Sequence, residues 1–546
     1  MVASLFVIEA PGKIRALEHI LKTLGHDAAV QATSGHLYEM PEDLGDLGID
    51  KTFRDHKRTA RNDKAIWYLR KAAREAETIY VATDADAEGD VIAWDVHELV
   101  KDINPEIYRM KLKGMDTASI EASLADVYPV RKSDAVPGRT RAIIDRMIGH
   151  SFSRDGIGVG RVSTGLLGML SKHGDKLGTV KVRLVAPAKD GDAPWATEFD
   201  TNKTITPEIA DKLTALSFPA IDMRARKPAP GDAMHMGEIM VRAGDELGMT
   251  PKESAKSLQS MYETGQMSYP RSNSKGVSKG AQRRLERMIR KSGFRGKADR
   301  ISAKGDEDVH DAPYPIGDVD VSKDPRKLGD DHGVRTMVAR NMVRSSLSRE
   351  RQAAHSAEIE DFLKTQGFDD KVSKFVASRN WTREIGPRFP GEKTFQESST
   401  TQRMPETVLL EKAVALGLGR PSTWANHIDS FMSRGLCDDN LQLTDKGQAW
   451  AAASPDELLN PQLSNLIEKA CDRILPEMMD DPDREPWSIL AEKIAGSLPD
   501  NLSNQMLGDL EPDAPRTENA YEMDIQRIDG GSDVQADQTR EAELKH

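Results

Sequence analysis

The chain has 546 residues, 38% apolar and 30% charged, and this length predicts three to five domains around separate cores. No apolar run approaches the roughly 20 residues of a membrane span and no basic, cleavable leader is present, so we expect no membrane partner and a cytoplasmic location. The two cysteines, Cys437 and Cys471, exclude a disulfide framework and a four-cysteine zinc site.

Charge is distributed unevenly along the chain, whose net charge is -12. Residues 509–546 hold eleven acidic and four basic residues with few large apolar ones, which predicts a disordered tail. Residues 51–74 hold nine Lys or Arg against two acidic residues, and residues 271–304 hold twelve against two. Basic runs are more often solvated helix faces, but segregated ones of this kind also suit a nucleic-acid backbone.

The first hundred residues alternate between strand and helix patterns. A short apolar strand ends at Glu9, and the sequence PGK then opens a helix with a 3.6-residue apolar period, which Gly25 closes. A second strand over residues 78–83 leads through an acidic turn into a helix over residues 91–100. This order predicts a mainly parallel sheet. Because chemistry collects beyond the carboxyl ends of such strands, we expect Glu9 and the acidic turn to form one site.

Helical patterns dominate the rest of the chain, interrupted by a strand-like stretch, WATEFD, near residue 195. The predicted helical segments are residues 120–176, 237–265, 281–291, 409–435 and 461–475. No internal repeat is present.

The acidic turn lies in the stretch YVATDADAEGDVIAW, which places Asp84, Asp86 and Glu88 at alternate positions. Carboxylate oxygens suit Mg²⁺, which usually takes only one or two protein carboxylates. The alternative is an ordinary helix start whose acidic side chains complement the helix dipole. Glu9 favours the cation, because four acidic groups at one sheet edge are costly without one. No P-loop is present, so ATP is not implied.

A second constellation is the stretch MSYPRSNS, in which Pro270 and Arg271 follow Tyr269 and the basic helix lies downstream. An arginine can hold a phosphate through two hydrogen bonds while a neighbouring phenol attacks phosphorus. The alternative is a buried strand tyrosine, which for a lone Tyr-x-Arg is the more frequent case.

These stretches together resemble the type IA DNA topoisomerases. FVIEAPGK is similar to the family's opening strand, and ATDADAEGDVIAW to its Asp-x-Asp-x-Glu motif in a Toprim domain. GRTRAIIDRMIGHSFS and GVGRVSTGLL resemble its arginine-bearing helices, LQSMYETGQMSYPRSNS its nucleophile segment, VHDAPYPIG its histidine motif and GRPSTWANHIDSFMSRGL its Arg-Pro-Ser-Thr helix. The resemblance implies a multidomain α/β plus α fold, with an N-terminal Toprim (Rossmann-like) domain, helical DNA-binding domains and a β-rich arch in a toroidal core.

The resemblance also implies a role for each matching residue. Tyr269 attacks a phosphate of single-stranded DNA and becomes joined to its 5′ end, while Arg271 and His310 stabilise the charge on phosphorus. Glu9, assisted by Lys13, protonates the departing 3′ oxygen. The implied Mg²⁺ ligands are Asp84, Asp86, Glu88 and Glu9. The positions that match supporting or DNA-contacting residues are His36, Arg109, Arg139, Arg141, Arg161, Glu263, Arg420, Ser422 and Thr423.

The implied activity is ATP-independent cleavage of one DNA strand, passage of another and religation, which relaxes negatively supercoiled DNA, decatenates it, or both. Single-stranded and negatively supercoiled DNA are the implied partners, a helicase is a candidate partner, and a monomer is expected. The implied domains are a Toprim domain (1–125), a helical DNA-binding domain in two parts (126–195 and 406–505), an arch in two parts (196–235 and 381–405), a domain carrying the nucleophile (236–380) and an acidic tail (506–546).

The sequence departs from the family pattern at several positions. Asn273 stands where aspartate is common, and Ala85 and Ala87 replace a usual proline and arginine. The acidic tail stands where zinc modules follow many family cores. The missing modules and the Ser-Tyr-Pro-Arg wording around Tyr269 lean toward the decatenating, topoisomerase III-like branch. Two further hypotheses stay open: a Toprim nuclease or primase with a coincidental tyrosine segment, and a non-catalytic nucleic-acid-binding relative.

Overall fold

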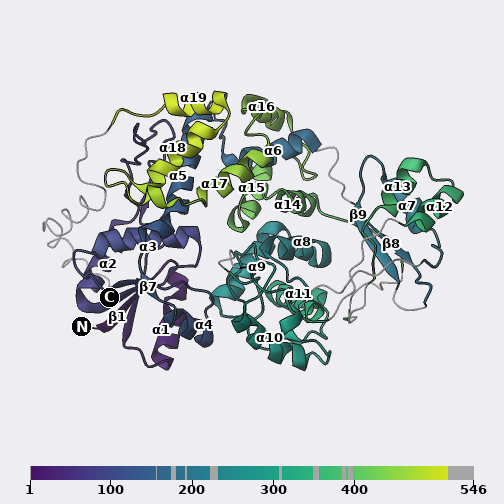
Figure 1. The fold of residues 1–546 in the computed structure, drawn as a ribbon, viewed down its shortest axis with the longest axis horizontal. Coiled ribbons are helices and arrows are strands. Elements are labelled where there is room, and N and C mark those ends of the chain that lie inside the picture. The colour runs from purple at the N-terminus through teal and green to yellow at the C-terminus, as the bar shows by residue number, and fades with distance from the viewer. Residues whose placement is uncertain are drawn as a thin grey trace, which may run out of the picture. The chain divides into compact units, whose positions relative to one another are not determined.

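The computed structural model describes residues 2–154, 156–173, 180–190, 194–221, 231–305, 310–347, 356–383, 389–390 and 397–513. The chain forms two compact units, one from Met1–Gly165 with Ala452–His546 and one from Leu166–Ala451 (Figure 1). Most of the predicted acidic tail, from residue 514 onward, lies outside the described residues. Within the described part, no helix is long and apolar enough to cross a membrane.

The first unit begins with a five-stranded sheet in the order β2-β1-β5-β6-β7. Neighbouring strands pair in parallel from β2 to β6, and β7 pairs antiparallel with β6, so the prediction of a mainly parallel sheet is confirmed. The strands are β1 (Val2–Ile8), β2 (Ala28–Ala32), β5 (Ala76–Val81), β6 (Ile107–Arg109) and β7 (Tyr128–Pro129). A separate ribbon pairs β3 (Tyr38–Glu39) with β4 (Thr59–Ala60).

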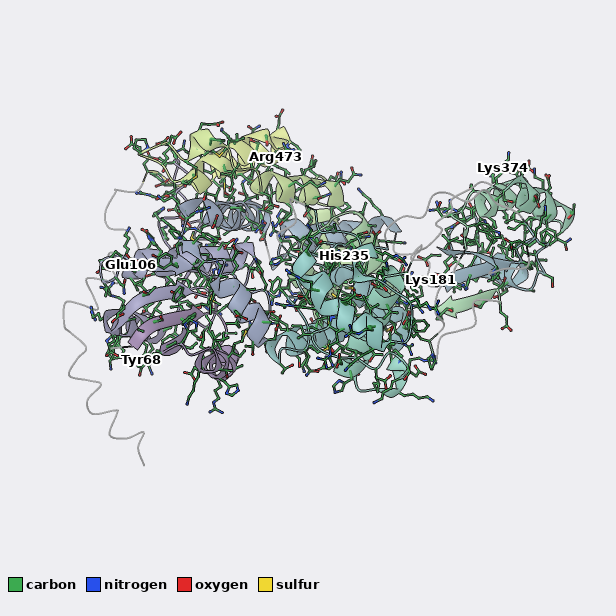
Figure 2. All side chains as sticks on the ribbon, turned by 60° about the horizontal axis from the view of Figure 1, so that its bottom comes forward. Tyr68, Glu106, Lys181, His235, Lys374 and Arg473 are labelled. Atoms are coloured by element: carbon green, nitrogen blue, oxygen red, sulfur yellow. The ribbon has the colours of Figure 1, made fainter. Side chains whose placement is uncertain are left out.

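Helices cover both faces of this sheet. Figure 1 shows α2 and α3 on one side and α1 and α4 on the other. Side chains alternate along each strand, so Leu5 and Val7 pack into one apolar cluster with α2 and α3, while Phe6 stacks on Tyr80 at 4.9 Å on the opposite face. The outer side of α2 carries Tyr68, which is 49% exposed (Figure 2). The helices are α1 (Ile14–Thr23), α2 (Asp63–Glu75), α3 (Ala87–Val100) and α4 (Thr117–Leu124).

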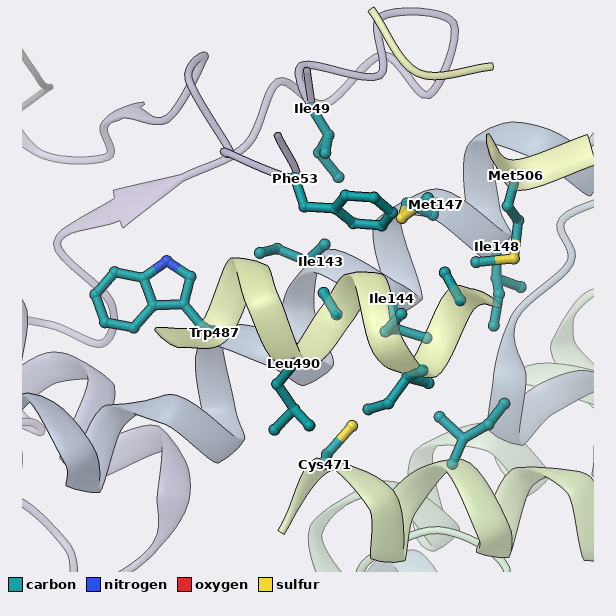
Figure 3. Close-up of a cluster of buried hydrophobic side chains, with 14 of the residues drawn as sticks. Ile49, Phe53, Ile143, Ile144, Met147, Ile148, Cys471, Trp487, Leu490 and Met506 are labelled. Atoms are coloured by element: carbon teal, nitrogen blue, oxygen red, sulfur yellow. The ribbon is translucent and has the colours of Figure 1, made fainter. Parts of the chain in front are cut away.

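The remainder of the first unit is helical, and its helices come from both the N-terminal and the C-terminal segment of that unit. Its buried cluster, part of which Figure 3 shows, joins Ile49 and Phe53 to apolar side chains from four further helices and from α3. The predicted tail boundary at residue 506 is wrong by a few residues, because Met506 is buried in this cluster and the backbone of Glu511 pairs with that of Ile49 and Lys51. The four helices are α5 (Lys132–Phe152), α17 (Pro461–Cys471), α18 (Pro486–Ser497) and α19 (Asp500–Gly508).

The second unit contains a helical part and a sheet part. The helical part comprises α8 (Met236–Leu247), α9 (Pro251–Glu263), α10 (Lys279–Lys291), α11 (Asp330–Ser345), α14 (Pro405–Ala415) and α15 (Pro421–Ser433). Pro251 opens α9 behind a Thr250 cap, as its position in the sequence predicts. Two further helices, α6 (Arg161–His173) and α16 (Asp445–Ala453), lie where the chain passes from one unit to the other.

The sheet part has four antiparallel strands in the order β10-β9-β8-β11. Its strands are β8 (Val180–Ala186), β9 (Trp195–Asp200), β10 (Thr382–Arg383) and β11 (Ser399–Gln402), and its helices are α7 (Pro207–Thr214), α12 (Ala357–Thr365) and α13 (Asp370–Ala377). One apolar cluster holds strands and helices together. The expected arch boundaries therefore shift: β8 begins before residue 196, and α12 and α13 belong to the sheet part and not to the domain of Tyr269.

Candidate active site in two parts

The acidic turn connects β5 to α3 at the carboxyl end of the sheet. Asp86 caps α3, its side chain accepting the backbone N–H of Gly89 at 2.8 Å. Thr83 closes the turn with a hydroxyl hydrogen bond to the Gly89 carbonyl at 2.7 Å. A Cβ at position 89 would lie 2.1 Å from the carbonyl oxygen of Asp84, so this tight turn requires glycine there. The helix-cap role, open as an alternative in the sequence, is thus real for Asp86.

Lys13 and Asp84 form a buried ion pair beside this turn. The Lys13 ammonium, on a residue only 1% exposed, donates to Asp84 at 2.7 Å. Lys13 belongs to the short helical turn Pro11–Lys13 directly after β1, so the strand order brings two distant motifs together. The lysine offsets one carboxylate charge at the sheet edge without any bound ion.

Arg109, at the end of β6, holds the acidic turn in place through hydrogen bonds from its guanidinium. Its guanidinium donates to Asp90 at 2.9 Å and to the backbone carbonyls of Thr83 and Asp84 at 3.0 and 2.7 Å. Only 1% of Arg109 is exposed and its donors are used inside the protein, which fits the supporting one of the two roles expected for it. Burial raises the pKa of Asp90, against the opposing charges of Arg109 and Lys111.

Glu9 and His36 lie beside each other at the same sheet edge. The backbone carbonyl of Glu9 accepts the N–H of Gly35 at 3.3 Å, which positions the loop that carries His36. Both side chains are half-buried. Burial lowers the pKa of His36, partly offset by the negative charges of Asp95 and Glu88, so the imidazole is mainly neutral at pH 7. The prediction that Glu9 and the acidic turn share one edge is therefore confirmed.

The residues of the acidic turn fit a hard divalent cation by chemistry. Their carboxylate oxygens are the ligands that such an ion prefers. Among the residues that the structure describes, however, no three His, Cys, Asp or Glu side chains already converge as a metal cage. Asp84 is paired with Lys13 through Oδ1, and Asp86 caps α3 through Oδ1, so one oxygen of each carboxylate is already engaged within the protein.

The tyrosine segment lies in the second unit, after α9. Met267 pairs with Pro315, and Ser268 and Tyr314 exchange two hydrogen bonds of 2.9 Å, which fix the backbone just before Tyr269. The Tyr269 ring lies 4.6 Å from the His310 ring and 5.4 Å edge-to-face from the Tyr262 ring, measured between centroids. Tyr269 and His310, 41 positions apart in the sequence, are thus neighbours, and Tyr269 is only 2% exposed.

Arg271 is half-buried and Asn273 is exposed in the same segment. Tyr262, a neighbour of Tyr269 that sequence reasoning missed, occupies the last turn of α9 seven residues earlier. A tyrosine at the end of a predicted helix, shortly before the tyrosine segment, is the signal that could have found it.

Two of the remaining candidate arginines are buried in ion pairs of the first unit. Arg139 donates to Asp55 at 2.6 Å and its guanidinium lies 4.5 Å from the ring centre of Trp487. Arg161 pairs with Asp145 at 2.8 Å and Glu468 at 2.7 Å. Acidic partners within the protein hold the guanidinium groups of Arg139 and Arg161, which fits the supporting one of the two roles expected for them.

The other candidate residues are more accessible. Arg141, which pairs with Glu468 at 3.1 Å, Glu263, which accepts from Gln259 at 2.8 Å, and Arg420 are half-buried. Thr423 donates its hydroxyl to the Arg420 carbonyl at 2.9 Å at the start of α15. The side chain of Ser422 lies outside the described residues.

Sequence reasoning missed the acidic partners that hold these arginines. Asp55 binds Arg139 at 2.6 Å, and Asp95 on α3 lies 3.7 Å from the same guanidinium while it binds Arg58 at 2.8 Å. The positions of Asp90 and Asp95 on a helix directly after a parallel strand could have marked them as inward-facing, but their partners come from distant segments. The first unit thus holds Glu9, Lys13 and the acidic turn, and the second holds Tyr269, Arg271 and His310.

Comparisons with known proteins agree with these two parts. Residues 4–114 match the Toprim domain, and residues 131–483 match the DNA topoisomerase family. The chain is 24% identical to DNA topoisomerase 1 of Aquifex aeolicus over 476 residues, which cover 80% of this chain and 87% of that one. It is 23% identical to DNA topoisomerase 1 of Campylobacter jejuni over 560 residues, which cover 89% and 77%.

The solved structure of full-length topoisomerase I from Thermotoga maritima shares the fold. Its TM-score is 0.57 at 17% identity, with 90% of this chain and 88% of that chain covered. A Toprim sheet and a helical region of the topoisomerase type define an enzyme that acts on DNA and changes its topology. Because the family match spans more than half of the sequence, the chain belongs to the type IA DNA topoisomerases.

Proposed function

We propose that Tyr269 is the nucleophile with which this topoisomerase cuts one DNA strand. The observation that supports it is the buried pairing of the Tyr269 phenol with the His310 imidazole, 4.6 Å apart between ring centres, within the family match. In the reaction a bond forms from the phenolic oxygen to phosphorus while the bond to the 3′ oxygen breaks. Religation reverses both changes, so no nucleotide is consumed.

The proton balance assigns the other candidate roles. The phenol releases its proton to water as it attacks, and Glu9, in its acid form, gives one to the departing 3′ oxygen; Lys13 lies in the helical turn that follows Glu9, and religation reverses both transfers. Arg271 and His310 stabilise the negative charge on phosphorus. Because Tyr269 is only 2% exposed, DNA reaches the phenol after the groups that cover it move.

A divalent metal ion is the cofactor class that the Toprim domain indicates. We take it to be Mg²⁺, held by carboxylates of the set Asp84, Asp86, Glu88 and Glu9. When bound, the ion would offset negative charge and orient the DNA phosphate. The Lys13 ammonium contacts one oxygen of Asp84, Oδ1, so the other oxygen is the one that would face the ion.

DNA contacts in this proposal come from the half-buried candidates His36, Arg141, Glu263, Arg420 and Thr423, and from Ser422, whose side chain lies outside the described residues. Arg109, Arg139 and Arg161 instead position the elements around them through buried ion pairs. A helicase partner, a monomeric state and a cytoplasmic location stay predictions; the buried, unpaired thiols of Cys437 and Cys471 support the last of these.

The test replaces Tyr269 with Phe and incubates negatively supercoiled plasmid with Mg²⁺ and no ATP. We expect the wild type to give a ladder of relaxed topoisomers and to form a covalent adduct on a 5′ phosphate of single-stranded DNA. Tyr269→Phe removes the attacking oxygen and should lose both, at least about 10³-fold, the scale on which removing a catalytic group acts. Equal ladders from both proteins would show that another residue is the nucleophile.

A further inference from the structure

The outer face of α10 is the most basic helix surface that the described residues present. The helix contains six Lys or Arg and one acidic residue, Glu286. Ala281, Leu285, Met288 and Ile289 are buried and fix which side faces the protein. The exposed cations on the other side are Lys279, Arg283, Arg287, Arg290 and Lys291, here called the basic stripe.

The stripe is regular along the helix axis. Lys279, Arg283, Arg287 and Lys291 follow at intervals of four residues, so successive cations are about 6 Å apart and the row is about 18 Å long. Three more exposed cations follow the helix in the sequence, Arg295, Lys297 and Arg300, with one exposed acidic residue, Asp299, among them. Figure 1 shows α10 at the lower margin of its unit.

Acidic side chains compensate the stripe only in part. The Asp318 carboxylate accepts from Arg287 at 3.0 Å and also pairs with Lys291. All three side chains are exposed, so these ion pairs gain little strength from burial. Glu286 is engaged by the backbone N–H of Ala298 at 3.1 Å. Within the part of the chain that the structure describes, no carboxylate is recorded in an ion pair with Lys279, Arg283 or Arg290. Like charges this close repel, which a polyanion would relieve.

We propose that the basic stripe binds the sugar–phosphate backbone of duplex DNA. The inference rests on the proposed function only in that the ligand is DNA. The stripe is all cation and no aromatic side chain belongs to it, so it is built for phosphates and not for stacking on unpaired bases. A duplex presents phosphates every 3.4 Å of axis on each strand, so an 18 Å row of cations meets several of them.

The stripe lies on the outer side of the element that supports the tyrosine segment. On the inner side of α10, Arg284 donates to the Tyr314 hydroxyl at 3.3 Å, and Tyr314 pairs with Ser268, next to Tyr269. Duplex DNA on the stripe is therefore anchored to the same part of the second unit as the nucleophile. The stripe thus adds a binding surface for double-stranded DNA to an enzyme whose chemistry needs a single strand.

The test compares two triple variants of the full-length protein. One removes three stripe cations, Arg283→Ala, Arg287→Ala and Arg290→Ala. The control removes three exposed cations from α12 and α13, Lys364→Ala, Lys371→Ala and Lys374→Ala (Figure 2). Both lose the same charge, but the control lysines lie among five acidic residues within 356–378, so they form no basic surface.

The measurement is fluorescence anisotropy of a labelled 25-base-pair duplex, without metal, over a series of salt concentrations. If all three arginines contact phosphates, the slope of log affinity against log salt becomes shallower by about 2.7 in the stripe variant. The wild type then loses about 40-fold more affinity than that variant between 50 and 200 mM salt. The control should keep the wild-type slope within about 0.5.

Each outcome decides the inference. A slope change of about 1 or more that is confined to the stripe variant supports it, and Arg290→Ala alone should then give about 0.9. A smaller change, or an equal change in the control, overturns it and attributes duplex binding to overall charge or to other surfaces. Plasmid relaxation by the same wild-type sample tests the proposed function separately, so the two can fail independently.

Discussion

At the scale of single residues, buried arginines with internal partners explain much of the first unit. Arg109 spends its donors on Asp90 and on backbone carbonyls of the acidic turn, including those of Thr83 and Asp84. A buried charge of this kind stabilises only when every donor is used, and removing one partner leaves the other without compensation. The role of Arg109 is therefore to position the acidic turn.

Replacing Arg109 with Met should destabilise the first unit by about 3–5 kcal/mol, because Asp90 would stay buried without its main partner. Denaturant unfolding measures the loss. Lys111→Met is the matched control: Lys111 pairs with the same Asp90 at 3.1 Å but is half-exposed, so we expect about 1 kcal/mol or less. A stable Arg109→Met protein with weakened DNA binding would instead restore the direct-contact role.

Asp50 fixes a turn that places an aromatic ring in the core. Its carboxylate accepts the backbone N–H and the hydroxyl of Thr52 at 2.9 and 2.6 Å and the N–H of Arg54 at 3.2 Å. Between them Phe53 takes a left-handed backbone conformation, with φ of 62°, and its ring enters the buried cluster (Figure 3). Such a conformation in a bulky residue is strained and needs the turn to hold it.

Asp50→Asn should lower the free energy of unfolding by about 1–3 kcal/mol at pH 7, since charge-assisted hydrogen bonds are lost. Burial alone would raise the pKa of Asp50, but the hydrogen bonds from Thr52 and Arg54 outweigh it and the pKa lies below its ordinary value. A lowered carboxylate pKa contributes stability that is present above the unfolded value of about 3.9 and is lost as pH falls below it. The gap between wild type and variant should therefore be constant from pH 7 to 5 and narrow below about pH 4; a gap that widens on acidification contradicts this.

At the scale of elements, an ion cluster ties the sheet part of the second unit to its helical part. Arg403, between β11 and α14, is buried and binds Asp200 at the end of β9 at 2.9 Å, Asp245 on α8 at 2.7 Å and Glu411 on α14 at 2.7 Å. Lys181 on β8 binds Asp245 as well, at 2.7 Å. Three elements thus meet at one guanidinium, where the chain leaves the sheet part, and β8 joins them through Asp245.

Arg403→Met should loosen this junction, because three carboxylates would be left with one fewer cation. We expect the second unit to lose about 3–5 kcal/mol, the usual cost of breaking a buried ion pair. Limited proteolysis should cut the variant faster near residues 403–405 than the wild type. Arg403→Lys keeps the positive charge but loses the planar guanidinium that can bind several carboxylates, so its proteolysis rate should lie between those of the wild type and Arg403→Met. Wild-type proteolysis rates in both variants would show that packing alone holds the junction.

At the scale of the whole molecule, the chain forms two units, and it passes from one to the other twice along the sequence. The first unit closes only when α17, α18 and α19 return to pack on α5, so residues more than 300 positions apart share one core. The second unit is continuous in sequence and has a core of its own in its sheet part. Separate cores predict separate unfolding events.

A matched pair of tryptophan substitutions tests this independence. Trp487→Ala opens a cavity in the cluster of the first unit and Trp381→Ala in that of the second, and each should cost about 3–5 kcal/mol. Scanning calorimetry should show each variant lowering a different transition and leaving the other in place. A single transition that both variants shift equally would mean that the units unfold as one.

Local chemistry in the sequence determined the elements that its periodicity marks. The opening strand, its helix closed by Gly25, the acidic turn before α3 and the start of α9 at Pro251 all follow from short-range rules of capping, turn geometry and side-chain alternation. The convergence of Glu9 with the acidic turn followed as well, because parallel strands place their carboxyl ends together.

Tertiary structure alone decided which charged groups find each other. Nothing local shows that Lys13 would pair with Asp84, that Arg109, Arg139 and Arg161 would be buried by acidic partners, or that His310 would lie against Tyr269. Nor does it show that α12 and α13 join the sheet part, whose strands β8 and β11 pair across about 200 residues. The physical reason is that an ion pair or a strand pairing depends on distance in space, whereas periodicity and capping report only on neighbours along the chain.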